Sequence, residues 1–486
     1  MRSTTLLLPP PRRHHAAHVR PGAALFPAAG RSHLPPWTLA IGYVSGFAAV
    51  SGAALLRQPG LPATQTIWAE DGRIFYAQAT ALSFWRTLTT LHNGYMQLFP
   101  RLAVQLARLV PAANTSTLLA LIGAVSLGAL SCLVFHMARG HIASPGLRVL
   151  LAAGMVLLPV ANVELLDNLV NVPWWLFFAT FWALIWRPRS RPGQVVAALL
   201  CFVAAASEPL VGLFLPLAVA RWAALREPAE QAAGAGLVLG LLYQAVVILP
   251  SSASALSSPG GLHDIGQSFA VRVGLGIVGG VKGTDWLAVH ERQLSIALGF
   301  AAIGAVLLLG LWARSSRVRL FTVVAVAYSA VCFVVPVWLR AVATALQAGT
   351  VRIAGRYQAI PVLLVMSAVL VLADYFAREG GAVWYSRWRV TPSRALPSRV
   401  PSRVPSRVPS RVTVAVAVAI CTAVFLPSWV ADFRGPNQRS SGPAWASEVA
   451  KAGAECRRTG NTTATLPIDP AHWTAILPCR VVAPAP

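Results

Sequence analysis

The sequence carries little charge for its length. Of its 486 residues only 12% are charged, whereas soluble domains carry about 25%. Hydrophobic residues make up 56%, and the mean hydropathy is +0.61. So few charged side chains cannot cover a water-facing surface. The composition therefore excludes an ordinary soluble protein and predicts an all-α bundle of membrane-spanning helices.

Acidic residues are much scarcer than basic ones, with 16 Asp and Glu against 40 Lys and Arg, which gives a net charge of +24. In a soluble protein such basicity would indicate a nucleic-acid partner. Here the basic residues fall between apolar segments, which is typical of cytoplasmic loops. We therefore predict membrane lipids as partners and no nucleic acid.

The six cysteines form no CxxC pair of the metal-binding kind. Four of them lie inside apolar runs, where they are most simply buried small hydrophobes. Cys456 and Cys479 instead bracket a polar tail that the topology places outside the cell, where disulfides persist. We expect a disulfide between them, with two free thiols as the alternative.

Apolar segments predict about eleven spans, since a hydrocarbon core of about 30 Å needs roughly 20 residues. With the N-terminus inside, the arginine-rich loops fall on the cytoplasmic side. Residues 194–207 and 209–222 are short and are separated by Glu208-Pro209, so two spans, one broken span or a re-entrant hairpin remain open. The segments are 37–56, 117–136, 148–163, 173–186, 194–207, 209–222, 234–250, 294–312, 320–339, 357–375 and 412–426.

This topology divides the chain into five parts. We expect a disordered, basic cytoplasmic tail (1–36), a transmembrane core (37–376) with a large first outer loop (57–114), a basic Pro-Ser-Arg-Val cytoplasmic linker (377–411), a last span (412–427) and a small extracytoplasmic tail (428–486). Within the outer loop, residues 74–88 and 98–109 predict helices that lie in the membrane interface. The GxGxxG match at 273–279 has no surrounding βαβ unit and lies in or beside an outer loop, so we discard it as a nucleotide site.

Two adjacent carboxylates, Glu70 and Asp71, follow the first span among aromatic residues. As a functional pair, one would accept a proton from an acceptor hydroxyl as general base, and the other would orient it or hold a divalent cation. If a divalent cation takes part, we expect Asp71 to contact it, and we predict no other cofactor. The alternative is an ordinary acidic loop paired with Arg73 or Arg101.

Further polar residues reach the same outer face and together predict one polar cleft. Taken singly, His92 and Asn168 are more often turn or capping residues than ligands. The candidate substrate-binding residues of this group are His92, Asn93, Tyr95, Arg101, Asn168 and Asn171.

Two further features involve charges near the membrane. Glu208 lies in an apolar region, where an ionisable group is a functional candidate unless a hairpin places it at the outer surface. Arg340, Arg352 and Arg356 form an outer basic cluster, which favours a bound lipid phosphate. Side chains that snorkel to the interface are the alternative.

The order of these features resembles the GT-C class of integral-membrane glycosyltransferases. That resemblance implies a catalytic base or metal contact in the first outer loop, matched here by Glu70 and Asp71, and a polyprenyl-phosphate sugar as the donor. A bacterial branch of the class resembles this chain more closely, in residues 68–75, 92–102 and 168–175, in Arg356-Tyr357, and in a tail where residues 473–479 pair with Cys456. We include Tyr357 among the substrate-binding candidates.

The resemblance predicts a multi-pass plasma-membrane enzyme that transfers a lipid-linked sugar to a cell-envelope acceptor on the outer face. The sequence has no WWDYG signature, which argues against transfer of a whole oligosaccharide to asparagine. Two alternatives remain. One is a transporter or scramblase for lipid-linked sugars or polysaccharides, which Glu208-Pro209 favours. The other is a scaffold without activity of its own.

Overall fold

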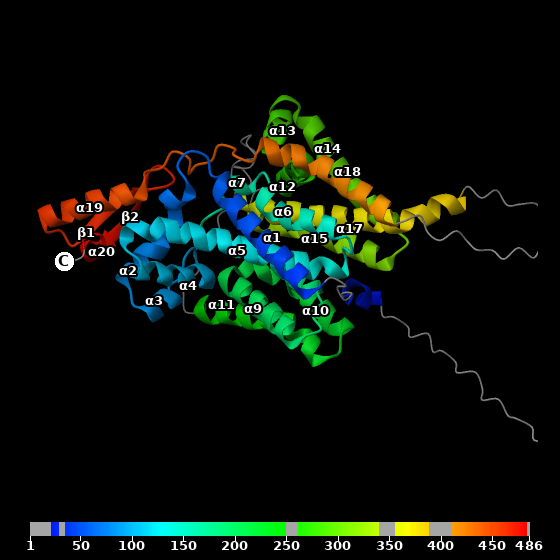
Figure 1. The fold of residues 1–486 in the computed structure, drawn as a ribbon, viewed down its shortest axis with the longest axis horizontal. Coiled ribbons are helices and arrows are strands. Elements are labelled where there is room, and N and C mark those ends of the chain that lie inside the picture. The colour runs from blue at the N-terminus through cyan, green and yellow to red at the C-terminus, as the bar shows by residue number, and fades with distance from the viewer. Residues whose placement is uncertain (1–20, 29–34, 249–260, 340–354, 388–409, 484–486) are drawn as a thin grey trace, which may run out of the picture.

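The computed structural model describes residues 21–28, 35–248, 261–339, 355–387 and 410–483 (Figure 1). Seven helices in these residues are long and apolar enough to cross a membrane, and four shorter apolar helices accompany them. The protein is therefore an all-α helical membrane protein with one small hairpin. The long helices are α1 (Pro36–Arg57), α5 (Thr115–Met137), α11 (Ala232–Ile248), α14 (Arg292–Trp312), α15 (Ser316–Leu339), α17 (Arg356–Arg387) and α18 (Ser410–Ala431).

The shorter apolar helices are α6 (Pro145–Leu157), α8 (Val172–Ile185), α9 (Arg191–Ser207) and α10 (Leu215–Ala224), the last preceded by the 3-10 turn η7 (Pro209–Phe214). Each segment predicted to span the membrane overlaps one of these eleven helices. Every residue of α8 is buried, because a helix that is apolar on all sides packs among other helices. In contrast, α1 and α18 keep most of their apolar side chains exposed.

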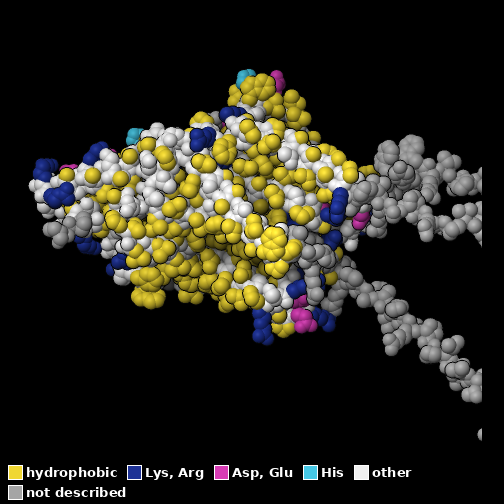
Figure 2. Space-filling view, in the orientation of Figure 1, with side chains coloured by type: hydrophobic (Ala, Val, Ile, Leu, Met, Phe, Trp, Pro, Cys, Tyr) yellow, Lys and Arg dark blue, Asp and Glu magenta, His cyan; other side chains and the backbone are white. Residues whose placement is uncertain are grey.

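The exposed apolar side chains form a broad surface over the middle of the molecule, while Lys and Arg gather mostly toward its ends (Figure 2). Trp37, Val44, Leu239, Leu308 and Ile420 are each more than half exposed. A surface of this kind is stable against lipid and unstable in water. The distribution agrees with the membrane location.

The chain reverses at Glu208-Pro209. Pro209 has no amide hydrogen and Glu208 is extended, so helix α9 ends there. Arg221, near the end of α10, donates from Nη1 to the carbonyls of Leu184 (2.6 Å) and Trp186 (2.7 Å). These two residues lie at the end of α8, just before the start of α9. The start of α9 and the end of α10 therefore lie at one end of the molecule. Helices α9 and α10 therefore form a hairpin.

Two segments that were expected to lie in the cytoplasm contain structure that the sequence did not predict. Residues 21–28, expected to be disordered, begin with the 3-10 turn η1 (Pro21–Leu25), and Phe26 is 1% exposed because it packs beneath the Arg221 guanidinium. The expected linker begins later than 377, because α17 continues to Arg387 in a sequence without proline before Pro392. The remaining residues of the tail and linker, 1–20, 29–34 and 388–409, lie outside the described part.

The segment expected as an outer loop near residue 273 is helical. It contains α12 (Leu262–Phe269), the π-helical turn η9 (Ala270–Leu275) and α13 (Gly276–His290). Gly274 is needed here for packing, because a Cβ atom at this position would lie 2.2 Å from the carbonyl oxygen of Gly299 in α14. Gly274 therefore serves contact between helices.

Residues 57–114, the predicted first outer loop, and the C-terminal tail fold together at one end of the molecule (Figure 1). Ile67 and Ala69 form backbone hydrogen bonds with Asp469 of the tail. We call this combined structure the loop–tail unit. Its elements are η2 (Ala63–Gln65), η3 (Asp71–Tyr76), α2 (Ala77–Ala81), α3 (Phe84–Thr89), α4 (Leu98–Leu106), η4 (Ala107–Leu109), η5 (Ala112–Asn114), α19 (Trp445–Thr459), β1 (Thr463–Ile468), β2 (Trp473–Pro478) and α20 (Cys479–Val482).

The C-terminal tail has secondary structure of its own. Strands β1 and β2 pair antiparallel, with Thr463 opposite Pro478. The structure contains the predicted disulfide between Cys456 and Cys479, whose Cα atoms are 5.7 Å apart. This bond ties α19 to the end of the hairpin. Trp445 lies buried against Tyr76, so the tail and the outer loop share one hydrophobic cluster.

Candidate functional site

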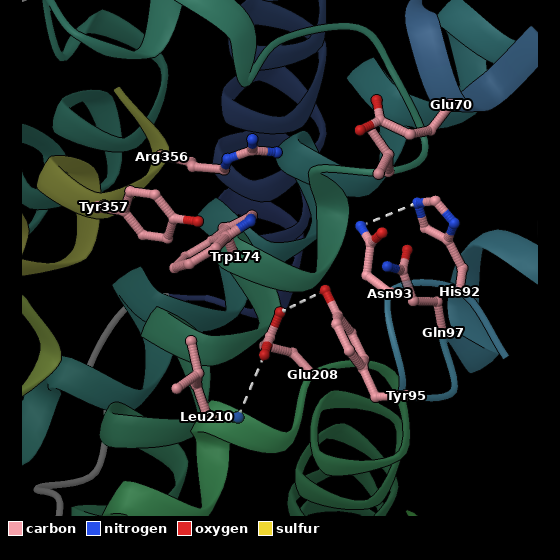
Figure 3. A pocket seen from close by; sticks show the side chains of 11 residues that line it. Glu70, His92, Asn93, Tyr95, Gln97, Trp174, Glu208, Leu210, Arg356 and Tyr357 are labelled. Carbon is pink, nitrogen blue, oxygen red and sulfur yellow. Dashed lines mark hydrogen bonds between the residues drawn. The ribbon is translucent and has the colours of Figure 1, made fainter. Parts of the chain in front are cut away.

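A polar pocket opens where the loop–tail unit meets the ends of the apolar helices (Figure 3). The outer loop, the connection before α8, the break after α9 and the start of α17 each contribute to its wall. Figure 3 shows Glu70, His92 and Asn93 on one side, and Arg356, Tyr357 and Trp174 on the other. The lining residues are Glu70, His92, Asn93, Tyr95, Gln97, Val170, Trp174, Glu208, Leu210, Arg356 and Tyr357.

A tight turn presents His92 and Tyr95 to the pocket. The amide of His92 donates to the carbonyl of Tyr95 (2.9 Å), and the amide of Tyr95 donates back (3.3 Å). Between them, Asn93 and Gly94 both have positive φ, of 53° and 82°. Asn-Gly is the preferred pair for such a turn because both residues tolerate this backbone region. The local sequence therefore fixes the shape of this wall.

Two side chains from the apolar helices hold this wall in place. Gln244 of α11 accepts a hydrogen bond from the amide of Met96 (3.0 Å) and donates to the carbonyl of the same residue (2.7 Å). Ser207 of α9 accepts from the amide of Phe99 (2.9 Å) at the start of α4. The segment from Tyr95 to Phe99 is thus fixed to two helices of the core.

Glu208 lies at the base of the pocket. It is 3% exposed, and its Oε1 accepts a hydrogen bond from the amide of Leu210 (3.2 Å), which caps η7. Its Oε2 accepts from the Tyr95 hydroxyl (3.3 Å). This carboxylate therefore joins the break after α9 to the turn of the outer loop.

Arg356 and Tyr357 form the opposite wall at the start of α17. Glu164 accepts a hydrogen bond from the Arg356 amide (2.9 Å), and its Oε1 lies 3.7 Å from the Arg356 Nε. The ring of Tyr357 meets that of Trp174 edge to face, with centroids 5.4 Å apart. This wall therefore combines one guanidinium with two aromatic rings.

Glu70 and Asp71 face different surroundings although they are adjacent. Glu70 is partly exposed and lines the pocket. Asp71 is 1% exposed, and its two oxygens accept hydrogen bonds from the amides of Leu169 (2.7 Å) and Val170 (2.9 Å). Asp71 therefore holds the 169–170 segment against the outer loop, and Glu70 is the carboxylate that reaches the pocket.

Behind this wall, a buried arginine joins the tail to residues 63–66 of the loop and to the connection before α8. Arg439 donates to Thr66 Oγ1, to the carbonyls of Ala63 and Thr66, and to the carbonyl of Asp167, each at 2.8 or 2.9 Å. Its charge also acts on Asp71, Asp167 and Asp469. Burial lowers the pKa of Arg439. The charge of this one guanidinium therefore acts on three buried carboxyl groups.

The same burial perturbs these carboxyl groups. Burial raises the pKa of Asp71 to about 7, although the amides of Leu169 and Val170 and the charge of Arg439 oppose it. Burial likewise raises the pKa of Asp167 to about 7 and that of Asp469 to about 6, with Arg439 again opposing. All three values lie well above the ordinary value of 3.8.

These shifts predict a pH-dependent stability. Between about pH 4 and pH 7 the folded protein retains carboxyl protons that the unfolded chain has released, so stability falls as the pH rises through this window and levels off above it. We expect the melting temperature of the protein in lipid nanodiscs to be several degrees lower at pH 8 than at pH 5.

The variant Asp167→Asn tests whether titration of a buried carboxyl group causes the loss of stability. Asparagine tolerates the positive φ of this position (56°) and does not titrate, so the variant should show a smaller loss of melting temperature over the same range. An unchanged pH profile in Asp167→Asn would contradict the assignment of this titration.

Several predicted site residues lie outside the pocket lining. The buried Arg101 stacks on Phe75 and donates to Gln78 Oε1 (2.9 Å). Asn168 donates to the carbonyls of Glu164 and Leu166, and accepts from the amide of Asn171. Both asparagines therefore shape the turn before α8. Arg340 and Arg352 lie outside the described residues.

The predicted metal contact stays a prediction. Within the described ranges, no group of three or more His, Cys, Asp or Glu side chains is arranged to hold a metal ion. Asp71 uses both of its oxygens for backbone amides.

Four lining residues were not among the predicted site residues, namely Gln97, Val170, Trp174 and Leu210. Gln97 follows the Asn-Gly turn, and a polar residue between Met96 and Leu98 was the available signal. Val170 and Leu210 are apolar and gave none. Arg439, which supports the site from the tail, also lacks any local motif.

Comparison of the chain with family models, with curated proteins and with solved structures gave no match. The function must therefore be argued from the pocket and its surroundings.

Proposed function

We propose that this protein is a plasma-membrane glycosyltransferase that moves a sugar from a polyprenyl-phosphate donor to a cell-envelope acceptor on the outer face. One observation carries the proposal. A single pocket places Glu70 across from Arg356, and that pocket lies at the ends of apolar helices. A lipid-borne phosphate can approach Arg356 from the membrane while its sugar lies beside Glu70.

The topology belongs to the proposal. All eleven apolar helices cross the membrane in a GT-C-like arrangement, with the N-terminus in the cytoplasm and the loop–tail unit outside. The arginines that follow α5, α8, α10 and α14 then lie inside, as the positive-inside rule requires. The tail disulfide then lies in an oxidising compartment.

In the proposed reaction, Glu70 accepts the proton of an acceptor hydroxyl. The hydroxyl oxygen forms a bond to the anomeric carbon of the donor, and the bond from that carbon to the phosphate oxygen breaks with inversion. The electron pair leaves with the polyprenyl phosphate, whose negative charge Arg356 stabilises. Asp71 acts by holding the 169–170 segment in place.

The aromatic residues give the pocket a preference for rings. Trp174, Tyr357 and Tyr95 present faces and edges against which the apolar side of a sugar ring can pack, while their polar atoms bond to hydroxyl groups. Arg356 lies 5.6 Å from the centre of the Tyr357 ring, so the phosphate and sugar positions adjoin.

A transporter or scramblase of lipid-linked sugars is the second candidate, because the break at Glu208-Pro209 lies at the pocket and interrupted helices are common at transport sites. Proteoliposomes containing a labelled polyprenyl-phosphate sugar distinguish the two. Transfer of label to an acceptor is the expected result. Movement of the label across the bilayer without transfer would favour transport, and neither event would favour a scaffold.

A further inference from the structure

The two walls of the pocket differ in their chemistry. One carries the Arg356 guanidinium, and the other carries the imidazole and amide side chains of His92, Asn93 and Gln97 (Figure 3). The side-chain Nδ2 of Asn93 lies 3.1 Å from the Nε2 of His92. A guanidinium suits a phosphate, whereas primary amides offer paired donors and acceptors that match neighbouring hydroxyl groups.

Gln97 has an unsatisfied amide. The side chain is 3% exposed, and its Oε1 has no hydrogen-bond partner among the described residues. Leaving a buried acceptor unpaired costs free energy, so such a group in a pocket wall calls for an explanation. Rotation of the terminal amide exchanges its oxygen and nitrogen, which lets either atom face a ligand.

The backbone around Gln97 is held too firmly to supply a partner. Gln244 fixes both backbone groups of Met96, and Ser207 fixes the amide of Phe99. Gln97 therefore stands between two anchored residues at the start of α4. After rotation of the amide, a ligand or a water molecule in the pocket is the remaining source of a hydrogen bond.

We infer that the 92–97 wall is a binding subsite for the hydroxyl groups of a sugar, and that Gln97 determines which sugar is bound. The inference rests on the proposed function, because it assigns the sugar to one wall and the phosphate to the other. A site built to bond a particular hydroxyl rejects analogues that lack it, since its buried polar group is then left unpaired.

The test uses the full chain in nanodiscs and a panel of methyl glycosides with their monodeoxy analogues, measured by saturation-transfer NMR. We expect at least one glycoside to bind, and removal of one particular hydroxyl to weaken binding at least tenfold. Gln97→Met, which keeps the length of the side chain, should abolish this discrimination. Gln97→Glu, which keeps its shape, should change the preferred glycoside.

Gln105→Met is the matched control, because Gln105 lies on α4, the helix that Gln97 precedes, and bonds to Arg108 outside the pocket lining. It should leave discrimination unchanged, and melting temperatures report whether each variant is folded. The inference is overturned if no glycoside binds the unaltered chain, or if both Gln97 variants discriminate as it does. Glycoside binding that depends on Gln97 without any sugar transfer would overturn the enzyme proposal alone. Transfer that is indifferent to Gln97 would overturn only this inference.

Discussion

Glu70→Gln should lower the rate of sugar transfer about a thousandfold while the protein remains folded and inserted. Glutamine keeps the shape of the side chain but cannot accept the proton of the acceptor hydroxyl. Because Glu70 is partly exposed in the pocket, the substitution leaves no buried charge unpaired. Initial rates with saturating donor, together with the melting temperature, measure the two effects separately.

Glu455→Gln is the matched control for this prediction. Glu455 lies in the same loop–tail unit but outside the pocket, on α19, where its exposed carboxylate faces Arg458. Its replacement should leave the transfer rate unchanged. A rate in Glu70→Gln equal to that of the control would remove Glu70 from the reaction.

Asp71→Asn should fail in a different way. One of its oxygens becomes an NH2 group that faces a backbone amide, so the contact with Leu169 or Val170 is lost. The melting temperature and the transfer rate should fall together, whereas Glu70→Gln changes only the rate. This contrast separates a residue that reacts from one that positions the pocket.

Arg439→Met should destabilise the loop–tail unit by about 3–5 kcal/mol, because buried acceptors that lose their donor cost about 1–3 kcal/mol each. The substitution removes the donors to Thr66, Ala63 and Asp167, and leaves the buried carboxylates without their common cation. The tail should then separate from the outer loop. Limited proteolysis of the protein in nanodiscs, followed with a C-terminal tag, measures the release of residues 435–486.

Arg458→Met is the control for the tail, because Arg458 is exposed on α19 and meets only an exposed glutamate there. Surface ion pairs of this kind contribute about 1 kcal/mol or less. Equal protease resistance of Arg439→Met and Arg458→Met would show that the buried network does not hold the tail.

The helices were predictable because lipid requires long apolar segments, and each such segment overlaps a helix. The reversal at Glu208 was not, since the local sequence is compatible with several paths. Its direction depends on Arg221, whose hydrogen bonds reach the end of α8. The fold of the tail also could not be predicted from local sequence patterns, because Arg439 bonds to Thr66, which is 373 residues away.

For the candidate site, the sequence identified residue types better than side-chain directions. His92, Asn93, Tyr95, Glu208 and Arg356 come from distant segments and line one pocket, although their roles stay predictions. Nothing in the sequence distinguished which of Glu70 and Asp71 would face the pocket. Packing against the 169–170 segment turns Asp71 away from the pocket, and that packing is visible only in three dimensions.

The most direct test of the account is a transfer assay on purified protein in lipid, with a panel of polyprenyl-phosphate sugars as donors. The account predicts that the unaltered chain transfers sugar from at least one donor and that Glu70→Gln transfers almost none. Absence of transfer from every donor by a correctly inserted protein would contradict the proposed function.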